Sequence, residues 1–548
     1  MAIQRSTIPV ALLVLVSLCR APPPPQKQAV ASVTFDEKTK TFVIVDVYDK
    51  SATAFATFTD DIQNSGWAHL NLTTNPKYDD SVQAYAAGLI EGYLSSTLIY
   101  YHWVNTVYEF CVQPSEYCTK LKKYLQANLQ WMTQQIKENP NDDYWHQVNL
   151  TLIQLMGIED GFHNSIKEPR IDVEPFGFLL LQIDGDLEDL ESALTNGKLK
   201  RPLGSGSCSA LIKLLPGNSD LYVSHVTWSP YQSMLRVMKK YDFGYHQSDG
   251  SLMPGRTSSF SSNPGRVFSG DDFYIIESGL VTLETTNGNS NPALWKYVQP
   301  EGQLLEWLRN IIANRLAKDA MMWADIFRKY NSGTYNNQWM VVDYNRFVPH
   351  QTPKTGLLVI LEQLPGLVVA EDKTDVLTGQ SYWPSYNVPY FKEIFNASGL
   401  PAKVAKYGDW FTYEKTPRAL MFLRNQSQVT DMKSMIKLMR YNDFQHDELS
   451  KCNCTPPYSG ENAISARSDL NPANGTYPFS TLGNRSHGGT DMKVTNMAMH
   501  KDFSMIAICG PTHDQQPVFQ WSTSGFNNQS HLGQPDRFDF EQVLVKWN

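Results

Sequence analysis

Residues 207–228 read SCSALIKLLPGNSDLYVSHVTW. Two apolar runs, 209–215 and 221–228, are typical of strands, and the PGNS stretch at 216–219 is a turn signal between them. We therefore predict a β-hairpin. The polar stretch 195–207, TNGKLKRPLGSGS, comes before it with three glycines and a proline, so we predict a linker that ends at the hairpin.

The predicted hairpin gives Cys208 a set of neighbours. If residues 216–219 turn the chain, Cys208 stands opposite Thr227 on the second strand, and His225 and Trp228 return to the vicinity of the thiol. These two residues are three positions apart, so a regular strand directs them to opposite faces of the sheet. A bulge or a strand end would be needed for both to serve one site.

The rest of the chain adds strands and helices in separate blocks. Strands are predicted where β-branched and aromatic residues dominate, and helices where apolar residues recur at helical spacing. In the first 195 residues we expect one or two strands followed mainly by helices. Separate blocks predict an α+β fold and not alternating βαβ units. The predicted strands are residues 41–48, 272–277, 280–285, 338–344 and 357–362, and the predicted helices are residues 79–110, 118–138, 144–156, 301–330 and 431–441.

The composition and the N-terminus indicate an exported globular protein. Of 548 residues, 42% are apolar and 12% aromatic, which is enough to build a large core. Residues 1–21 (MAIQRSTIPVALLVLVSLCRA) combine Arg5 with a short apolar run, so we predict a signal peptide and a lumenal or secreted product. No later stretch is apolar over about 18 residues, so we expect no transmembrane anchor. Eight sequons predict glycosylation, at Asn71, Asn149, Asn396, Asn425, Asn453, Asn474, Asn484 and Asn528.

Six cysteines follow the signal peptide, and thiols in an oxidising compartment usually form disulfides. Cys111 and Cys118 could close a small loop, while Cys452 and Cys454 could pair with each other or one of them with Cys509. A zinc site at the Cys-x-Cys pair is the weaker alternative, because no second Cys pair or His pair stands at metal spacing. We expect neither a metal nor an organic cofactor.

The charge of the chain bears on its partners. The net charge is −8 and no basic tract occurs, so we expect no nucleic-acid partner. Protonation of all twelve histidines in an acidic lumen would make the net charge positive. This is compatible with a lysosomal enzyme near anionic lipid, although the signal peptide and the sequons fit secretion equally well.

Cys208 has three interpretations. It could be a small buried residue or half of a disulfide. It could be a papain-like nucleophile with a separate histidine, but that family's local signature is absent. In the third interpretation the chain is cut between Ser207 and Cys208, and the new terminal residue carries both a thiol and an α-amine. An α-amine has a pKa of about 8 and can accept the thiol proton, which puts base and nucleophile on one residue.

The stretch SCSALIKLLPGNSDLYVSHVTWSPYQSMLRVMKKYDF resembles the nucleophile hairpin of the phospholipase B-like proteins, which belong to the N-terminal-nucleophile hydrolases. The resemblance continues through FSGDDFYIIESGLVTLETT, GTYNNQWMVVDY, NVPYFKEIFN, LMRYNDF and PPYSGENAISARSDLNP, and it covers essentially the whole mature chain. It implies an α+β fold of the four-layer αββα sandwich type, with extra helices in the N-terminal part. It also implies a precursor cut into fragments 22–207 and 208–548, which stay associated as one unit.

The resemblance implies roles for five residues. Cys208 would be the nucleophile, and His225 and Trp228 fall where the family's site-lining residues lie. Asn387 opens an Asn-x-Pro-x-Phe element similar to one that supplies an oxyanion-site asparagine in bile-salt and penicillin acylases, and Arg440 is a candidate counterpart of a later arginine. By residue type alone, His225 is more often structural, Trp228 a core residue and Asn387 a turn former. The acylases carry Arg and Asp on the hairpin where this chain has His225 and Trp228, so their preference for substrate charge does not transfer.

The function implied by the resemblance is hydrolysis of acyl bonds, with fatty-acyl esters of glycerophospholipids as the substrates that the family name suggests. Amides of N-acyl lipids or peptides fit the same mechanism. A lumenal glycoprotein that binds lipid without turnover is the alternative of a different class. A serine lipase is disfavoured because no G-x-S-x-G elbow occurs. A homodimer is one candidate assembly.

Overall fold

The structure is a computed structural model, and it describes residues 26–108, 110–111, 115–165, 177–195 and 208–547. The predicted signal peptide and the predicted linker from residue 196 onward, including Ser207, lie outside the described residues.

The predicted hairpin is present at the start of the segment that follows the linker. β5 (Ser209–Leu214) and β6 (Leu221–Pro230) are antiparallel neighbours, and Pro216–Asn218 forms the turn between them. The main-chain N–H of Leu215 donates to the carbonyl of Asp220 at 3.0 Å. The predicted hairpin is therefore confirmed.

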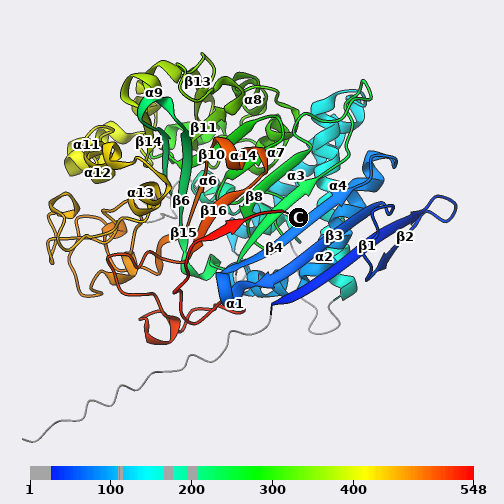
Figure 1. The fold of residues 1–548 in the computed structure, drawn as a ribbon, viewed down its shortest axis with the longest axis horizontal. Coiled ribbons are helices and arrows are strands. Elements are labelled where there is room, and N and C mark those ends of the chain that lie inside the picture. The colour runs from blue at the N-terminus through cyan, green and yellow to red at the C-terminus, as the bar shows by residue number, and fades with distance from the viewer. Residues whose placement is uncertain (1–25, 109, 112–114, 166–176, 196–207, 548) are drawn as a thin grey trace, which may run out of the picture.

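Within the described residues the strands form two sheets, and the hairpin lies in the smaller one (Figure 1). In order across the larger sheet, the strands are β13 (Leu367–Asp372), β12 (Leu358–Leu364), β11 (Asn337–Asp343), β10 (Leu280–Thr286), β9 (Phe273–Ile276), β8 (Thr257–Ser262), β7 (Arg236–Asp242), β4 (Trp67–Thr74), β3 (Ala54–Asp61), β1 (Lys27–Asp36) and β2 (Thr41–Val45). In order across the smaller sheet, they are β14 (Tyr382–Ser385), β5, β6, β15 (His487–Thr495), β16 (Met505–Cys509) and β17 (Val543–Val545).

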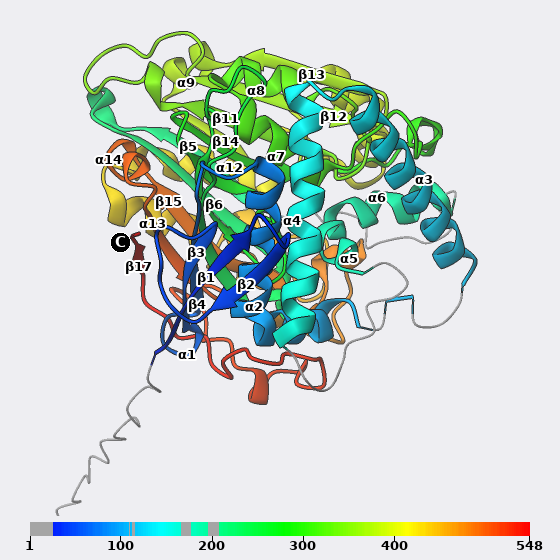
Figure 2. The same cartoon turned by 90° about the vertical axis from the view of Figure 1, so that its right-hand side faces the viewer.

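The hydrophobic cores tell how sheets and helices pack. One core lies between the two sheets and contains Ile212 and Val223 of the hairpin together with Leu283 of β10. A second core lies on the other face of the larger sheet (Figure 2), under α2 (Asp80–Thr106), α3 (Glu116–Glu138), α4 (Asp143–Ser165), α7 (Glu306–Leu316) and α8 (Ala320–Phe327). A third core lies on the other face of the smaller sheet, under α11 (Leu400–Tyr407), α12 (Pro417–Asn425) and α13 (Met432–Met439).

Alternate residues of β5 enter different cores, so both faces of the hairpin are buried. The mixed α+β fold class is therefore confirmed. The shorter helices are α1 (Ile62–Ser65), α5 (Leu179–Gln182), α6 (Asp184–Leu194), α9 (Thr374–Gln380), α10 (Lys392–Ala397) and α14 (Met497–Lys501).

The N-terminal part contains more strand than the sequence pattern predicts. Among the residues described from 26 onward, four strands, β1 to β4, come before α2, whereas we expected one or two. The core positions of β3 are Ala54, Ala56 and Phe58, and alanine at a core position gives little hydrophobic contrast. β4 then pairs in parallel with β7, which follows Cys208 in the chain. This pairing joins the parts of the chain on either side of the predicted cut in one sheet.

Residues 301–330 form two helices, α7 and α8, and not the single helix that their apolar spacing predicts. The side chain of Asp319 accepts a hydrogen bond from the main-chain N–H of Met322 at 2.9 Å. This bond caps α8, so a new helix begins there although the apolar spacing continues. The other predicted helices are confirmed as α2, α3, α4 and α13.

The predicted disulfide between Cys111 and Cys118 is present. Of the alternatives for the second pair, Cys452 is bonded to Cys454, and Cys509 is a buried free thiol.

None of the eight predicted glycosylation sites, all of which lie in the described residues, is fully buried, and a glycan needs such an accessible position. Glycan attachment itself stays a prediction. Within the described residues no helix combines the length and the apolar character that a bilayer span needs. The exposed asparagines are Asn396, Asn453, Asn474 and Asn528, and the half-buried ones are Asn71, Asn149, Asn425 and Asn484.

Candidate active site

Cys208 is the first described residue after the linker, and it lies directly before β5. Ser209 pairs with Val226 of β6, so the register continues to Cys208 opposite Thr227, as predicted. Cys208 is only 2% exposed. Its φ is +86°, which is rare for a residue other than glycine, so its neighbours must hold the main chain in place.

The surroundings of Cys208 keep its thiol neutral. Burial raises the pKa of the thiol well above its ordinary value, and negative charge on the nearby Glu284, when it ionises, raises this pKa further. The main-chain N–H of Trp228 donates toward the sulfur and lowers the pKa, but it does not outweigh burial. Because the thiolate is the reactive form, Cys208 needs a base before it can attack a carbonyl group.

A buried guanidinium group holds the main chain at Cys208. Arg418, in the first turn of α12, donates from Nη1 to the Cys208 carbonyl at 2.6 Å and to the Ser209 hydroxyl at 3.1 Å. From Nη2 it donates to the Tyr386 carbonyl at 2.9 Å and to Oδ1 of Asn387 at 2.6 Å. One planar group therefore fixes the main chain of Cys208 and the side chain of Asn387 relative to each other.

Asn387 reaches the site because β14 is the sheet neighbour of β5. Ser385, the last residue of β14, pairs with Ala210 of β5. Two residues later Asn387 has a φ of +68°, and its Nδ2 donates to the carbonyl of Thr286 at 2.7 Å. Strand pairing thus brings this asparagine beside the start of the hairpin.

His225 and Trp228 lie on opposite faces of β6, as their spacing predicts. His225 faces the core between the sheets, and its Nε2 donates to the carbonyl of Glu284 at 3.0 Å. A carbonyl only accepts, so Nε2 carries the proton of the neutral ring. Burial, with a further contribution from Lys493, lowers the pKa of His225 well below its ordinary value. Nδ1 is then an acceptor, and no described residue donates to it.

Trp228 faces the helices of the third core. The guanidinium carbon of Arg418 lies 4.2 Å from the centre of the Trp228 ring, a cation–π contact. Nε1 of Trp228 donates to the carbonyl of Ile464 at 3.3 Å. The hydrogen bond holds the indole in place, and the guanidinium group of Arg418 packs against its ring.

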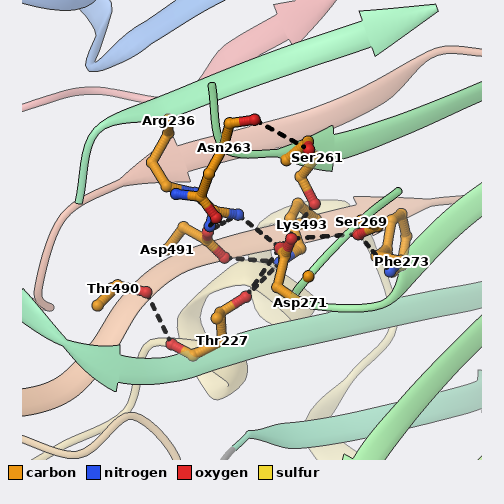
Figure 3. Close-up of polar contacts among 12 residues, drawn as sticks. Thr227, Arg236, Ser261, Asn263, Ser269, Asp271, Phe273, Thr490, Asp491 and Lys493 are labelled. Carbon is orange, nitrogen blue, oxygen red and sulfur yellow. Dashed lines mark hydrogen bonds and ion pairs between the residues drawn. The ribbon is translucent and has the colours of Figure 1, made fainter. Parts of the chain in front are cut away.

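A network of buried charges supports the hairpin at Thr227 (Figure 3). Asp271 accepts from Oγ1 of Thr227 at 3.1 Å, from Nη2 of Arg236 at 2.6 Å and from Nζ of Lys493 at 2.6 Å. Asp491 binds the same two cations, with Lys493 at 2.7 Å and Arg236 at 2.9 Å. Burial opposes the charge on Asp271, but the two cations outweigh it and hold the pKa of Asp271 below its ordinary value. The network therefore carries two buried cations and two buried anions that balance.

Three further carboxyl groups are buried near the site. Burial raises the pKa values of Asp272 and Glu284, and repulsion from Glu306 raises both further. For Glu306 burial is the largest cause, and the pKa is raised to about 8. The hydroxyl of Tyr335 donates to Oε1 of Glu284 at 3.2 Å, and Nδ2 of Asn310 donates to Oε1 of Glu306 at 3.0 Å. These carboxyl groups therefore hold protons at a pH where exposed carboxyl groups are ionised.

The described hydrogen bonds of Arg440 do not include Cys208 or Asn387. It lies at the C-terminal end of α13, where Nε donates to Asp514 at 3.1 Å and Nη1 donates to the carbonyl of Gly510 at 3.4 Å. The arginine that contacts Cys208 is Arg418, which was not among the predicted site residues. Its stretch PRALMFLRN contains no motif, and only the packing of α12 against the smaller sheet reveals its role.

The residues of the charge network were also not among the predicted site residues. Lys493 stands at a fully buried position of β15, in the stretch HGGTDMKVT. A charged residue at a core-facing position of a predicted strand would have indicated the network. Residues 487–495, however, were not predicted as a strand. Asp271 and Arg236 come from other parts of the chain, so no local spacing relates the three residues.

The similarity to known proteins extends over the chain both before and after Cys208. A family model described as Phospholipase B matches residues 54–545. The chain is 57% identical over 528 residues to the human protein "Putative phospholipase B-like 2", and the match covers 94% of this chain and 90% of the human protein. It is 46% identical over 513 residues to "Putative phospholipase B-like 1" of Caenorhabditis elegans, with 90% and 87% covered. It is 38% identical over 527 residues to "Phospholipase B-like protein B" of Dictyostelium discoideum, with 93% and 88% covered. This chain therefore belongs to the phospholipase B family.

Proposed function

We propose that this protein is a self-processing hydrolase of acyl bonds, and that Cys208 becomes its N-terminal nucleophile after the bond from Ser207 to Cys208 is cut. The observation that carries the proposal is the arrangement at Cys208. The buried thiol of Cys208 lies at the start of a strand. The guanidinium group of Arg418 donates both to the main-chain carbonyl of Cys208 and to the side chain of Asn387. Two stacked sheets with helices on their outer faces support a four-layer αββα sandwich of the N-terminal-nucleophile type.

The cut would be made by the chain itself. The sulfur of Cys208 attacks the carbonyl carbon of Ser207, and the peptide C–N bond breaks as the thiol proton passes to the departing nitrogen. This leaves a thioester between Ser207 and the Cys208 sulfur. Water then hydrolyses the thioester, which frees the thiol and leaves a carboxylate on Ser207. The positive φ of Cys208 supports this step, because a main chain held in an uncommon conformation is easier to distort toward the tetrahedral intermediate.

Turnover would use the group that the cut creates. The new α-amine of Cys208 accepts the thiol proton, and the sulfur attacks the acyl carbonyl of the substrate. Asn387 is the candidate donor to the oxyanion, and Arg418 supplies positive charge at the same place. The leaving group departs with the proton, and water releases the acyl group from the sulfur. His225 and Trp228 line the two faces of the strand beside the nucleophile.

Membership of the family supports a proposal for the substrate class. The names of the relatives point to phospholipids, so we propose fatty-acyl esters of glycerophospholipids as the first substrates to test. An amidase acting on N-acyl lipids or peptides is the alternative within the same mechanism. The alternative of a different class is a lumenal glycoprotein that binds lipid without turnover. We also propose a lysosomal or secreted location, which rests on the N-terminal sequence and the sequons.

Two measurements test the proposal. N-terminal sequencing of the purified protein should find a chain that begins at Cys208, and Cys208→Ala should remain uncut. The processed protein, incubated at acid pH with mixed phospholipids and N-acyl amides, should release fatty acid, and alkylation of Cys208 should abolish the release. Cutting of the Cys208→Ala chain at the same bond would assign the cut to an outside protease. No release from any substrate would favour the lipid-binding alternative.

A further inference from the structure

Glu362 is a buried carboxyl group whose hydrogen bonds converge on one segment of the chain. It lies on β12 and is 0% exposed. Its Oε1 accepts from the main-chain N–H of Tyr390 at 2.7 Å, and its Oε2 accepts from that of Phe391 at 3.0 Å. Nε2 of Gln338, on the neighbouring β11, donates to Oε1 at 2.6 Å. The two main-chain donors belong to the segment that Asn387 opens.

The segment needs such anchoring because Asn387 has a φ of +68°. A residue with a Cβ atom keeps this conformation only where its surroundings fix it. Before Asn387 in the chain, Trp383 of β14 donates from Nε1 to Oε1 of Gln338 at 3.3 Å. Glu362 and Gln338 therefore tie the chain to the larger sheet on both sides of Asn387.

A carboxyl group at this position is not explained by packing or by an ion pair. A position between two sheets normally carries an apolar residue, because an ionised carboxyl group is costly to bury unless its oxygens are hydrogen-bonded. The described contacts of Glu362 are neutral donors, and none of them is a lysine or an arginine. Burial raises the pKa of Glu362 to about 7, although the bonds from Gln338, Tyr390 and Phe391 oppose this. Glu362 therefore serves as an acceptor for main-chain N–H groups that no strand pairs.

We infer that Glu362 is a positioning residue, which holds the segment after Asn387 so that the Asn387 side chain stays between Arg418 and Thr286. The inference rests on the proposed function, in which Asn387 contacts the oxyanion. The described contacts of Glu362 do not include Cys208. It therefore acts on the reaction through Asn387 and has no catalytic contact of its own.

The substitution Glu362→Gln tests the anchoring directly. Glutamine keeps the shape of the side chain but offers one acceptor oxygen, and its amide group would face a main-chain N–H donor. In hydrogen–deuterium exchange of the purified protein at pH 8, where the Glu362 carboxyl group is ionised, the amides of Tyr390 and Phe391 should exchange about 100-fold faster in the variant than in the unsubstituted protein. The matched control is Glu306→Gln, another buried carboxyl group with a raised pKa, which should leave exchange in this segment unchanged.

A double-mutant cycle tests whether Glu362 acts through Asn387. Glu362→Gln should lower kcat for fatty-acyl release about 10- to 100-fold, because a displaced donor loses transition-state contact, while KM stays within about twofold. In the Asn387→Ala background the same substitution should cost nothing further, because the group that it positions is already gone. The rate of Cys208 alkylation by iodoacetamide should be unchanged in all variants, since Glu362 does not touch the thiol.

The outcomes separate this inference from the proposed function. Unchanged exchange at Tyr390 and Phe391 in Glu362→Gln overturns the inference. A loss of kcat that adds in full to that of Asn387→Ala also overturns it, because Glu362 would then act independently of Asn387. If the unsubstituted protein shows no Cys208-dependent release, the proposed function fails, and the exchange result alone then decides whether Glu362 anchors the segment.

Discussion

Nη1 of Arg418 donates to the carbonyl oxygen of Cys208 at 2.6 Å, and Arg418 is almost fully buried. Its described acceptors are two carbonyls, a hydroxyl and an amide oxygen, and no carboxylate is among them. Burial lowers the pKa of Arg418 to about 10, so the guanidinium group is still charged at neutral and acid pH. A buried cation without a bonded carboxylate stabilises negative charge that develops beside it. The proposed reaction develops such charge on a carbonyl oxygen next to Cys208.

Arg418→Lys should therefore reduce both self-cleavage and turnover. Lysine keeps the charge but cannot make four hydrogen bonds in a planar fork, so the Cys208 main chain and Asn387 lose their common anchor. We expect a loss of about 100-fold or more in kcat, the range seen when an oxyanion donor is removed. The measurements are the rate of appearance of the 208–548 fragment and the rate of fatty-acid release.

The matched control for this substitution is Arg424→Lys on the same helix. Arg424 forms its ion pair with Asp447 at 2.6 Å, in a half-exposed place. Its substitution should leave cleavage and turnover near the unsubstituted rates. Equal losses in the two variants would mean that helix α12 as a whole, and not the guanidinium group at Cys208, supports the reaction.

The hairpin could be predicted from the sequence, whereas the arrangement around it could not. The hairpin is local: two apolar runs and a turn determine which residues face each other, and Cys208 lies opposite Thr227 as expected. The contact of Arg418 with Cys208 depends on α12 packing on a sheet whose edge strand, β14, comes from a distant part of the chain. No periodicity or spacing within a window of sequence contains that information.

The burial of charged residues in the interior could also not be predicted from the sequence. A lysine such as Lys493 is exposed in most proteins, so its residue type suggests a surface position. It is buried here because Asp271 and Asp491 neutralise it (Figure 3). Such compensation becomes visible only when the strands are assembled.

Lys493→Met should destabilise the protein strongly. The substitution leaves one cation, Arg236, between two buried carboxylates, and an uncompensated buried charge costs about 3–5 kcal/mol. The free energy of unfolding, measured by urea denaturation at pH 7, should fall by that amount. Cys208 also stands opposite Thr227, which contacts the network, so self-cleavage should slow as well.

The double variant Lys493→Met, Asp491→Leu separates charge balance from packing. It removes one cation and one anion and leaves Arg236 paired with Asp271. Its stability should lie above that of Lys493→Met alone, because the remaining charges balance. A double variant less stable than the single one would show that packing at these positions, and not charge, dominates.

If the proposed cut before Cys208 is made, the two fragments should stay together without any covalent link. β4 and β7 pair in parallel across the cut, and Asp80 of α2 binds the Nδ1 of His246 at 2.8 Å from the other side. The disulfides of the described residues each join cysteines on one side of Cys208. The cut protein should elute as one species in size-exclusion chromatography and give two bands in non-reducing SDS gels. The Cys208→Ala chain is the control and should give one band, whereas a single band from the cut protein would contradict the prediction.

The buried carboxyl groups predict how stability depends on pH above neutrality. Burial raises the pKa of Glu306 to about 8 and that of Glu362 to about 7. In the unfolded chain both are ionised above pH 6, so the folded state holds the extra protons, and its stability is lost as pH rises through these folded pKa values. Between pH 6.5 and 8 the free energy of unfolding should fall by about 2 kcal/mol from Glu306 alone. Urea denaturation at several pH values measures it.

Glu306→Gln should reduce this decline by the share that Glu306 contributes, because glutamine has no proton to lose. The pH range of this measurement starts at pH 6.5 because, below that pH, buried histidines change the free energy of unfolding in the opposite direction. Burial lowers the pKa values of His102 and His487, so the unfolded chain takes up protons there first and stability falls with falling pH. Glu301→Gln, at an exposed position, is the control and should keep the full decline. An undiminished decline in Glu306→Gln would assign the pH dependence to other groups.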